Sequence, residues 1–299
     1  MFDSFQTLDC GGYPLKLDRP RIMGIVNATP DSFADGGHHD SVEAAISHAL
    51  KLAEEGADIL DVGGESTRPG ATEVSVDEEL RRVLPVIEGL RARTDLPISI
   101  DTSKPEVMRA AVAAGAGFIN DVYALRRDGA ADAAAQLGVP VCLMHMLGEP
   151  ASMQDDPVYE DVVADVHGFF TQRLFACQMA GIDRKKIMVD PGFGFGKTLE
   201  HNLRLLRQLP RLVELGVPVL VGLSRKGMIG AVTGRALPDR VVGSAAAALI
   251  AVQNGASVVR VHDVAATVDA LKVWDAVRAQ PGPAKRPATP AMPRWGDED

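Results

Sequence analysis

The sequence is poor in cysteine, aromatic residues and long apolar runs, and each shortage excludes a class of protein. Cys10, Cys142 and Cys177 lie far apart with no C-x-x-C spacing, which argues against a disulfide framework or structural zinc and favours a reducing, cytoplasmic compartment. No run of about 18 apolar residues predicts a membrane span, and no signal peptide is visible. The net charge of −9 argues against nucleic acid or an anionic membrane as the main partner.

What the sequence does contain is a repeated junction, in which a short apolar run ends at a residue able to bind or do chemistry. Hydrophobic residues make up 46 % of the chain and aromatic residues only 5 %, so the core is built from Val, Ile, Leu and Ala. The predicted strands are 22–26, 58–62, 98–100, 117–119, 139–144, 187–189, 217–223 and 258–261. Helical patterns lie between most of them, at 41–55, 77–93, 105–114, 156–180, 200–209, 238–254 and 263–279.

About eight strand–helix units with polar strand ends predict an α/β protein, a (β/α)₈ TIM barrel whose active site lies at the carboxyl ends of the strands. If one strand were wrongly assigned, an α/β domain with its site at the same strand ends would remain. Residues 1–20 are predicted to form a β-hairpin that closes the bottom of the barrel, and 21–279 form the barrel. Residues 280–299, rich in proline, are predicted to be a disordered tail.

Several strand ends carry oxygen-bearing side chains suited to a polar ligand. Asn27, with Asp31 and Asp35 in the following loop, offers hard oxygens of the kind that Mg²⁺ prefers. Asp101 and two further strand-end residues, Asn120 and Asp190, could hydrogen-bond a flat, nitrogen-rich heterocycle. The alternative is that these side chains cap backbone groups in turns.

Three stretches predict anion binding. The glycine-rich stretch 63–71 contains Arg68, the stretch Ser224-Arg225-Lys226 precedes a turn of helix, and Arg260 and His262 share one face of the last strand. The last two strand–helix loops of such barrels often hold phosphate. The alternative for each is a solvated basic residue or a core histidine. The loop 190–198 fails the phosphate-loop pattern because Pro191 stands where that pattern requires glycine.

These segments, in this order, resemble the dihydropteroate synthase family from about residue 20 to residue 278. The matching stretches are MGIVNATPDSF from Met23, GESTRPGA from Gly64, SIDTSKP from Ser99, ND from Asn120, MHM from Met144, DPGFGFGK from Asp190, SRK from Ser224 and RVH from Arg260. The resemblance implies a cytoplasmic, homodimeric transferase that joins a dihydropterin diphosphate to 4-aminobenzoate with Mg²⁺, and a target of sulfonamides.

The resemblance also implies roles for individual residues. The pterin is bound by Asp101, Asn120, Asp190 and Lys226, with Met144 and Phe195 packing near its ring. The diphosphate is held by Arg68, by Arg260-Val261-His262 and by a magnesium ion on Asn27. The residues expected to enclose 4-aminobenzoate are Phe33, Asp35, Thr67 and Pro69.

The chain departs from the family at Gly227, where many members carry serine near the carboxylate of 4-aminobenzoate. Two alternatives stay open at this point: a pterin-binding methyltransferase-type barrel and a non-catalytic pterin-binding homologue. The first needs no diphosphate site, so Arg68, Lys226 and Arg260 argue against it. A sugar-phosphate aldolase barrel would need a lysine inside a strand, and none is so placed.

Overall fold

The computed structural model describes residues 7–29, 38–66, 73–148 and 157–279. Eight parallel strands form one sheet in the order β8-β7-β6-β5-β4-β3-β10-β9. Their bounds are β3 (Arg21–Asn27), β4 (Ile59–Gly63), β5 (Ile98–Asp101), β6 (Phe118–Asp121), β7 (Val141–Met144), β8 (Ile187–Asp190), β9 (Leu220–Val221) and β10 (Val258–Val261).

The sheet closes on itself between its two outermost strands. Val189 of β8 forms a parallel bridge with Val219, which immediately precedes β9, and the Val189 N–H donates to Pro218 O at 3.0 Å. The predicted (β/α)₈ barrel is therefore confirmed, with β9 much shorter than the seven-residue run in the sequence.

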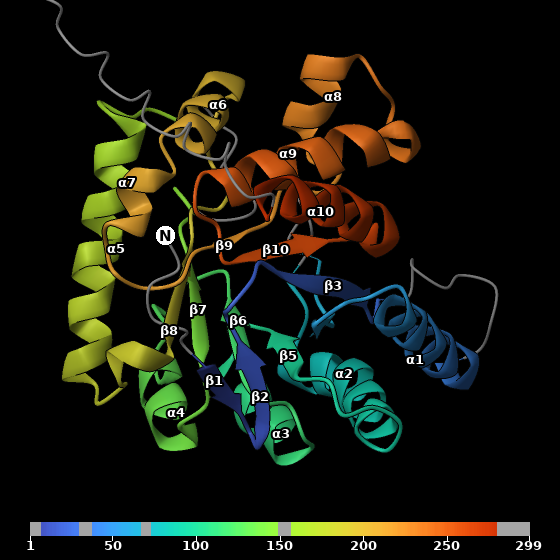
Figure 1. The fold of residues 1–299 in the computed structure, drawn as a ribbon. Helices are drawn as coiled ribbons and strands as arrows, with labels where there is room; N and C mark the ends of the chain where they lie inside the picture. The colour runs from blue at the N-terminus through green and yellow to red at the C-terminus, as the bar shows by residue number, and fades with distance from the viewer. Residues whose placement is uncertain (1–6, 30–37, 67–72, 149–156, 280–299) are drawn as a thin grey trace, which may run out of the picture.

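Helices surround the strands on the outside, as Figure 1 shows. They are α1 (His38–Glu54), α2 (Val76–Arg91), α3 (Pro105–Ala113), α4 (Ala130–Leu137), α5 (Val162–Met179), α6 (Leu199–Arg207), α7 (Pro210–Val213), α8 (Gly227–Thr233), α9 (Val241–Gln253) and α10 (Val264–Arg278). None of the helices in the described ranges is both long and apolar enough to cross a membrane.

Several of the helix predictions need correction, and the four-residue α7 was not predicted. Helix α5 begins at Val162 because the Asp161 carboxylate caps it, accepting from the Val163 and Ala164 N–H groups. Helix α9 begins at Val241, after a separate 3₁₀ turn at Leu237–Asp239. Helix α4 was also not predicted; five of its eight residues are alanine, and Ala130, Ala133 and Ala134 form its buried face.

Alternation along the strands separates two apolar layers. Side chains on the outward face pack against the helices, while an inner layer fills the lower part of the barrel with Met23, Ile59, Phe118 and Met188. The hairpin of β1 (Thr7–Cys10) and β2 (Tyr13–Lys16) adds four buried apolar side chains to that inner layer, namely Leu8, Cys10, Leu15 and Leu17. The predicted hairpin is thus confirmed, and the tail 280–299 lies outside the described residues.

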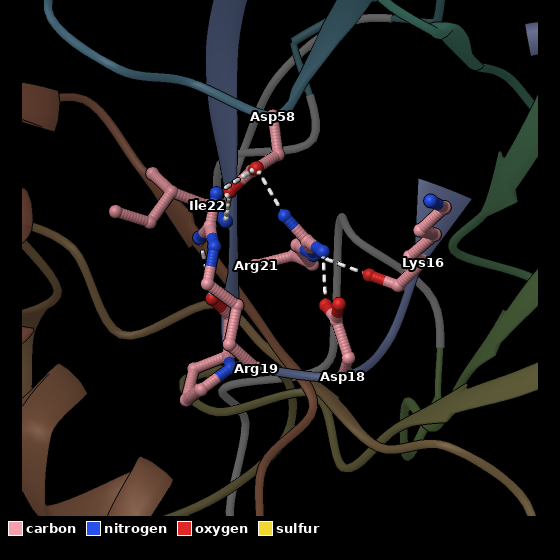
Figure 2. Close-up of polar contacts among 7 residues, drawn as sticks. Lys16, Asp18, Arg19, Arg21, Ile22 and Asp58 are labelled. Atoms are coloured by element: carbon pink, nitrogen blue, oxygen red, sulfur yellow. Dashed lines mark hydrogen bonds and ion pairs between the residues drawn. The ribbon is translucent and has the colours of Figure 1, made fainter. Parts of the chain in front are cut away.

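A polar network fastens the hairpin to the barrel (Figure 2). The Asp58 carboxylate, just before β4, accepts from the Arg19 and Arg21 side chains at 2.5 and 2.9 Å and from the Ile22 N–H at 3.0 Å. Arg21 also donates to Lys16 O and to Asp18. The connection between the hairpin and the first barrel strand is therefore held at several points.

Candidate active site

The inward-facing residues at the carboxyl ends of the strands are polar, in contrast to the apolar layer below them. Strand register places Gly63, Asp101 and Asn120 side by side across β4, β5 and β6, and places Met144 beside Asp190 across β7 and β8. Residues far apart in the sequence therefore converge at one end of the barrel, which we call the barrel mouth.

Arg260 of β10 links acidic residues of two other strands at this mouth. Its Nε donates to Asp61 Oδ2 at 2.6 Å and its Nη2 donates to Asp101 Oδ2 at 2.7 Å. Asp61 Oδ2 also accepts from Asn120 Nδ2 at 3.1 Å. Burial lowers the pKa of Arg260, but the two carboxylates outweigh burial and raise the pKa above its ordinary value. The guanidinium is thus fixed in place and permanently charged.

Asp101 has an unusual protonation equilibrium. Burial raises its pKa to about 7; the neighbouring Arg260 opposes this rise and the Asp61 charge adds to it. A carboxylate that titrates near neutral pH is characteristic of functional sites.

Asp190 and Lys226, which we call the Asp190–Lys226 pair, are two further charged groups of the mouth, and each favours the charged form of the other. Burial raises the pKa of Asp190, although its Oδ1 accepts from the Gly192 N–H at 2.8 Å and Lys226 favours its charged form. Burial lowers the pKa of Lys226 to about 8, against the attraction of Asp190. The Lys226 ammonium lies 4.1 Å from the centre of the Phe195 ring, in cation–π geometry.

A small apolar cluster, comprising Val122, Met144, Met146 and Phe195, lies in the same region. Tyr123 packs against it. Flat apolar side chains beside hydrogen-bonding groups suit an aromatic heterocycle, which needs both stacking and edge contacts.

His262 follows β10 and is neutral at physiological pH. Burial, with the charges of Arg260 and Arg225, lowers its pKa to about 4. Ser224 Oγ accepts from the His262 backbone N–H at 3.1 Å and lies 3.0 Å from Nδ1. Val261, between Arg260 and His262, points into the hydrophobic core, so only its backbone can contact a ligand.

The sequence predicts that Arg225 and Lys226 both belong to an anion-binding turn, but in the structure Arg225 is bound to a carboxylate. Its guanidinium makes two hydrogen bonds to Asp263, at 2.9 and 2.6 Å, and its backbone has a left-handed φ of 58°. Of the two basic residues in this turn, Lys226 is the one that lies with Asp190 and Phe195.

The predicted metal ligand Asn27 ends β3, beside Gly63 of β4, and is partly exposed at the mouth. The other loop residues predicted for the site lie outside the described ranges, namely Phe33, Asp35, Thr67, Arg68 and Pro69.

Sequence reasoning missed Asp61, which is completely buried and holds both Arg260 and Asn120. The available signal was an acidic residue in the middle of an apolar strand, where an unpaired carboxylate would be costly. A second missed group is Lys104, whose ammonium is bound by Glu65 and, at 2.6 Å, by the fully buried Glu79.

Comparison with known proteins agrees with this geometry. The model of the family described as pterin binding enzyme matches residues 23–262. The chain is 51 % identical to a dihydropteroate synthase of Escherichia coli strain K12 over 265 residues, covering 89 % of this chain and 94 % of that protein.

Solved structures are similar as well. A dihydropteroate synthase of Xanthomonas albilineans with 4-aminobenzoic acid superposes with a TM-score of 0.89 at 66 % identity, covering 93 % of this chain and all of the other. A second structure from that organism, in complex with 7,8-dihydropteroate, gives 0.85 at 63 % identity, with 92 % and 100 % coverage. A Yersinia pestis enzyme with a sulfonamide drug gives 0.87 at 48 %, with the same coverage.

Proposed function

The chain belongs to the family of pterin-binding enzymes and functions as a dihydropteroate synthase, and we propose that its barrel mouth joins (7,8-dihydropterin-6-yl)methyl diphosphate to 4-aminobenzoate. The observation that carries the proposal is the mouth itself, where Arg260, held between Asp61 and Asp101, lies beside Asn120 and a Phe195–Lys226 pair. Relatives at 63 and 66 % identity hold 7,8-dihydropteroate and 4-aminobenzoic acid.

The pterin occupies the inner part of the mouth. Carboxylates of Asp101 and Asp190 accept from its amino and ring N–H groups, Asn120 and Lys226 complete the hydrogen-bonding edge, and the ring packs against Met144 and Phe195. This assignment is supported by the mixture of buried polar groups and apolar surface, which discriminates strongly against ligands lacking the matching donors.

The diphosphate lies toward the outside, bound by Arg68, Arg260 and His262. A guanidinium has five donors, and Asp61 and Asp101 use two of those of Arg260. The neutral His262 donates a hydrogen bond without adding charge, and the Val261 backbone continues the same edge.

Magnesium fits the donor set of this region. Within the described residues no group of three or more His, Cys, Asp or Glu could enclose a metal ion. Mg²⁺ commonly takes only one or two protein ligands together with substrate phosphates and waters. Asn27 would supply one hard oxygen, and the bound ion would neutralise charge on the departing diphosphate.

The reaction breaks the bond between the pterin methylene carbon and the diphosphate oxygen, and the oxygen keeps the electron pair. The resulting positive charge spreads from the methylene into the pterin ring, where the Asp101 carboxylate stabilises it. The neutral aromatic amine then attacks the methylene, forms the new C–N bond and loses its proton to solvent.

The second substrate is enclosed by the loop residues Phe33, Asp35, Thr67 and Pro69, which exclude water that would otherwise trap the cation. The 4-aminobenzoate carboxylate faces the start of α8. There Gly227 replaces the serine of many relatives, and a side chain at this position would meet no atom within 4 Å.

The working unit is a homodimer in the cytosol. Exposed apolar side chains gather on α8, α9 and α10, including Val232, Val242, Ile250 and Val273, and α9 packs against both other helices. All three cysteines are buried free thiols, which suits a reducing compartment. Light scattering of wild type and Val242→Glu tests the dimer, which the charged variant should weaken.

The decisive experiment measures diphosphate release and dihydropteroate formation in parallel, with Mg²⁺ and the pterin diphosphate, with and without 4-aminobenzoate. Release matched by product, and lost in Asp101→Asn or Lys226→Ala, supports the synthase. Tight pterin binding by folded protein with no product would instead indicate a binding homologue.

A further inference from the structure

The loop that follows β8 is folded into an unusually tight shape. Three of its residues, Gly192, Gly194 and Gly196, have φ values of 67°, 80° and 61°, in the left-handed region. A Cβ on Gly192 would lie 1.9 Å from His145 O, and one on Gly196 would lie 2.6 Å from Leu147 O. The loop backbone therefore packs directly on the segment that follows β7.

One buried ammonium group holds this shape. Lys197 is only 3 % exposed, and its Nζ donates to Gly192 O and Phe195 O, both at 3.0 Å. The same nitrogen lies 2.9 Å from His145 Nδ1. Lys197 thus joins two carbonyls within its own loop to the segment after β7.

The groups in direct contact with the Lys197 amine are neutral, namely backbone carbonyls and the His145 imidazole, while Asp190 and Lys226 act on it by their charge. Burial lowers the pKa of its amine to about 7, while Asp190 favours the charged form. Burial also lowers the pKa of His145 to about 2, so that its imidazole is uncharged and can accept at Nδ1. The amine has no ion-pair partner among the described residues, and burying it is costly unless its hydrogen bonds are made. Those bonds run to Gly192 O, Phe195 O and His145, including a longer one of 3.4 Å to His145 O, and all depend on this loop shape.

The loop supports the pterin end of the barrel mouth. The Gly192 N–H donates to Asp190 Oδ1 at 2.8 Å, and the Phe195 ring lies under the Lys226 ammonium. A Cβ on Gly194 would lie 3.3 Å from Lys226 Cδ, so the loop backbone is also close to the stem of that lysine. Moving the loop would therefore displace both members of the Asp190–Lys226 pair.

We propose that Lys197 is a positioning residue for pterin recognition. By contacting Gly192 O, Phe195 O and the His145 ring at once, it fixes the loop and so sets the orientation of Asp190 and Lys226 without touching substrate itself. The inference rests on the proposed function, since it assigns the Asp190–Lys226 pair to the pterin. It predicts a selective defect, because the described contacts of the Lys197 amine lie within the loop after β8 and at His145, after β7.

The test is Lys197→Met, which keeps the length of the side chain and removes its donors. We expect the KM for the pterin diphosphate, and the Kd for 7,8-dihydropteroate by calorimetry, to rise at least tenfold. The KM for 4-aminobenzoate should stay within threefold of wild type. The control is Lys186→Met, which removes a comparable lysine–carbonyl bond, from Lys186 Nζ to Gly138 O at 2.5 Å, before β8. It should change neither constant.

Tyr159→Phe keeps the proposal testable if Lys197→Met does not fold. The Tyr159 hydroxyl donates to Gly196 O at 2.8 Å, so its loss should raise the pterin KM about threefold by loosening the same loop. A folded Lys197→Met with wild-type pterin constants, or with both KM values raised equally, overturns the proposal, as does an unchanged pterin KM in Tyr159→Phe. Wild-type protein that binds dihydropteroate but forms none refutes the function, while the calorimetric comparison still tests Lys197.

Discussion

The reaction should have a bell-shaped pH dependence, because two of the charged groups assigned to the pterin, Asp101 and Lys226, titrate on either side of pH 7.5. Asp101, with a pKa raised to about 7 by burial, must be ionised to stabilise the methylene cation. Lys226, with a pKa lowered to about 8 by burial, must keep its proton to donate to the pterin edge. Activity therefore falls as pH drops below 7 and as it rises above 8.

The size of the effect follows from these two values. The product of the two active fractions is about 0.6 near pH 7.5 and about 0.1 at pH 6 and at pH 9, so kcat/KM should fall about sixfold at either extreme. Ordinary pKa values for the two groups, about 3.9 and 10.4, would leave the profile flat across this range.

The assay is kcat/KM for the pterin diphosphate from pH 5.5 to 9.5, at constant ionic strength and saturating 4-aminobenzoate. Asp101→Asn should abolish the acidic limb along with most of the activity. Lys226→Arg, which carries a charge that does not titrate in this range, should flatten the alkaline limb in whatever activity remains. An acidic limb that persists unchanged in Asp101→Asn would belong to another group, such as Asp190, whose pKa burial also raises, or the diphosphate, and would refute the role given to Asp101.

Three further outcomes test the fold, the buried carboxylate and the metal. Gly117→Ala should destabilise the protein by about 3 kcal/mol in urea unfolding, because its Cβ would lie 2.0 Å from Cys10 O; Gly168→Ala, with no atom within 4 Å, should be neutral or slightly stabilising. Asp61→Asn removes one of two charges that hold Arg260 and should lower kcat/KM by about thirtyfold, or about 2 kcal/mol; a loss below threefold would count against the network. Chelation of Mg²⁺ should remove turnover, with recovery on adding Mg²⁺ and a raised Mg²⁺ requirement in Asn27→Ala; activity that survives exhaustive chelation would contradict the metal assignment.

The strand ends could be predicted from the sequence because their signal is local. An apolar run shows where a strand lies, and period-two alternation shows which residues face inward. Asp101, Asn120 and Asp190 were found in this way, and strand register then placed the first two side by side. The short α4 and the two-residue β9 were harder, since their limits depend on packing against neighbouring elements.

The pairing of the charged groups could not be predicted, because it depends on contacts between distant parts of the chain. Asp61 and Arg260 are 199 residues apart, and only the closed barrel brings them to 2.6 Å. The basic turn shows the same limit. Nothing in its sequence indicates that Arg225 would take a left-handed backbone and bind Asp263 while the Lys226 ammonium lies over the Phe195 ring.

The charges of the barrel mouth explain the direction of the proposed reaction. Three carboxylates, Asp61, Asp101 and Asp190, face two cations, Arg260 and Lys226, while the pKa of His262 is too low for it to add charge at neutral pH. Such an inner surface favours positive charge on the pterin and does not by itself neutralise a diphosphate. In the proposed mechanism the leaving group therefore takes further cations, from Arg68 and from magnesium, so that charge separates along the barrel axis as the bond breaks. On this proposal Arg260 must be held by acids while its remaining donors bind the diphosphate, and the bond from its Nε to Asp61 is what would hold it.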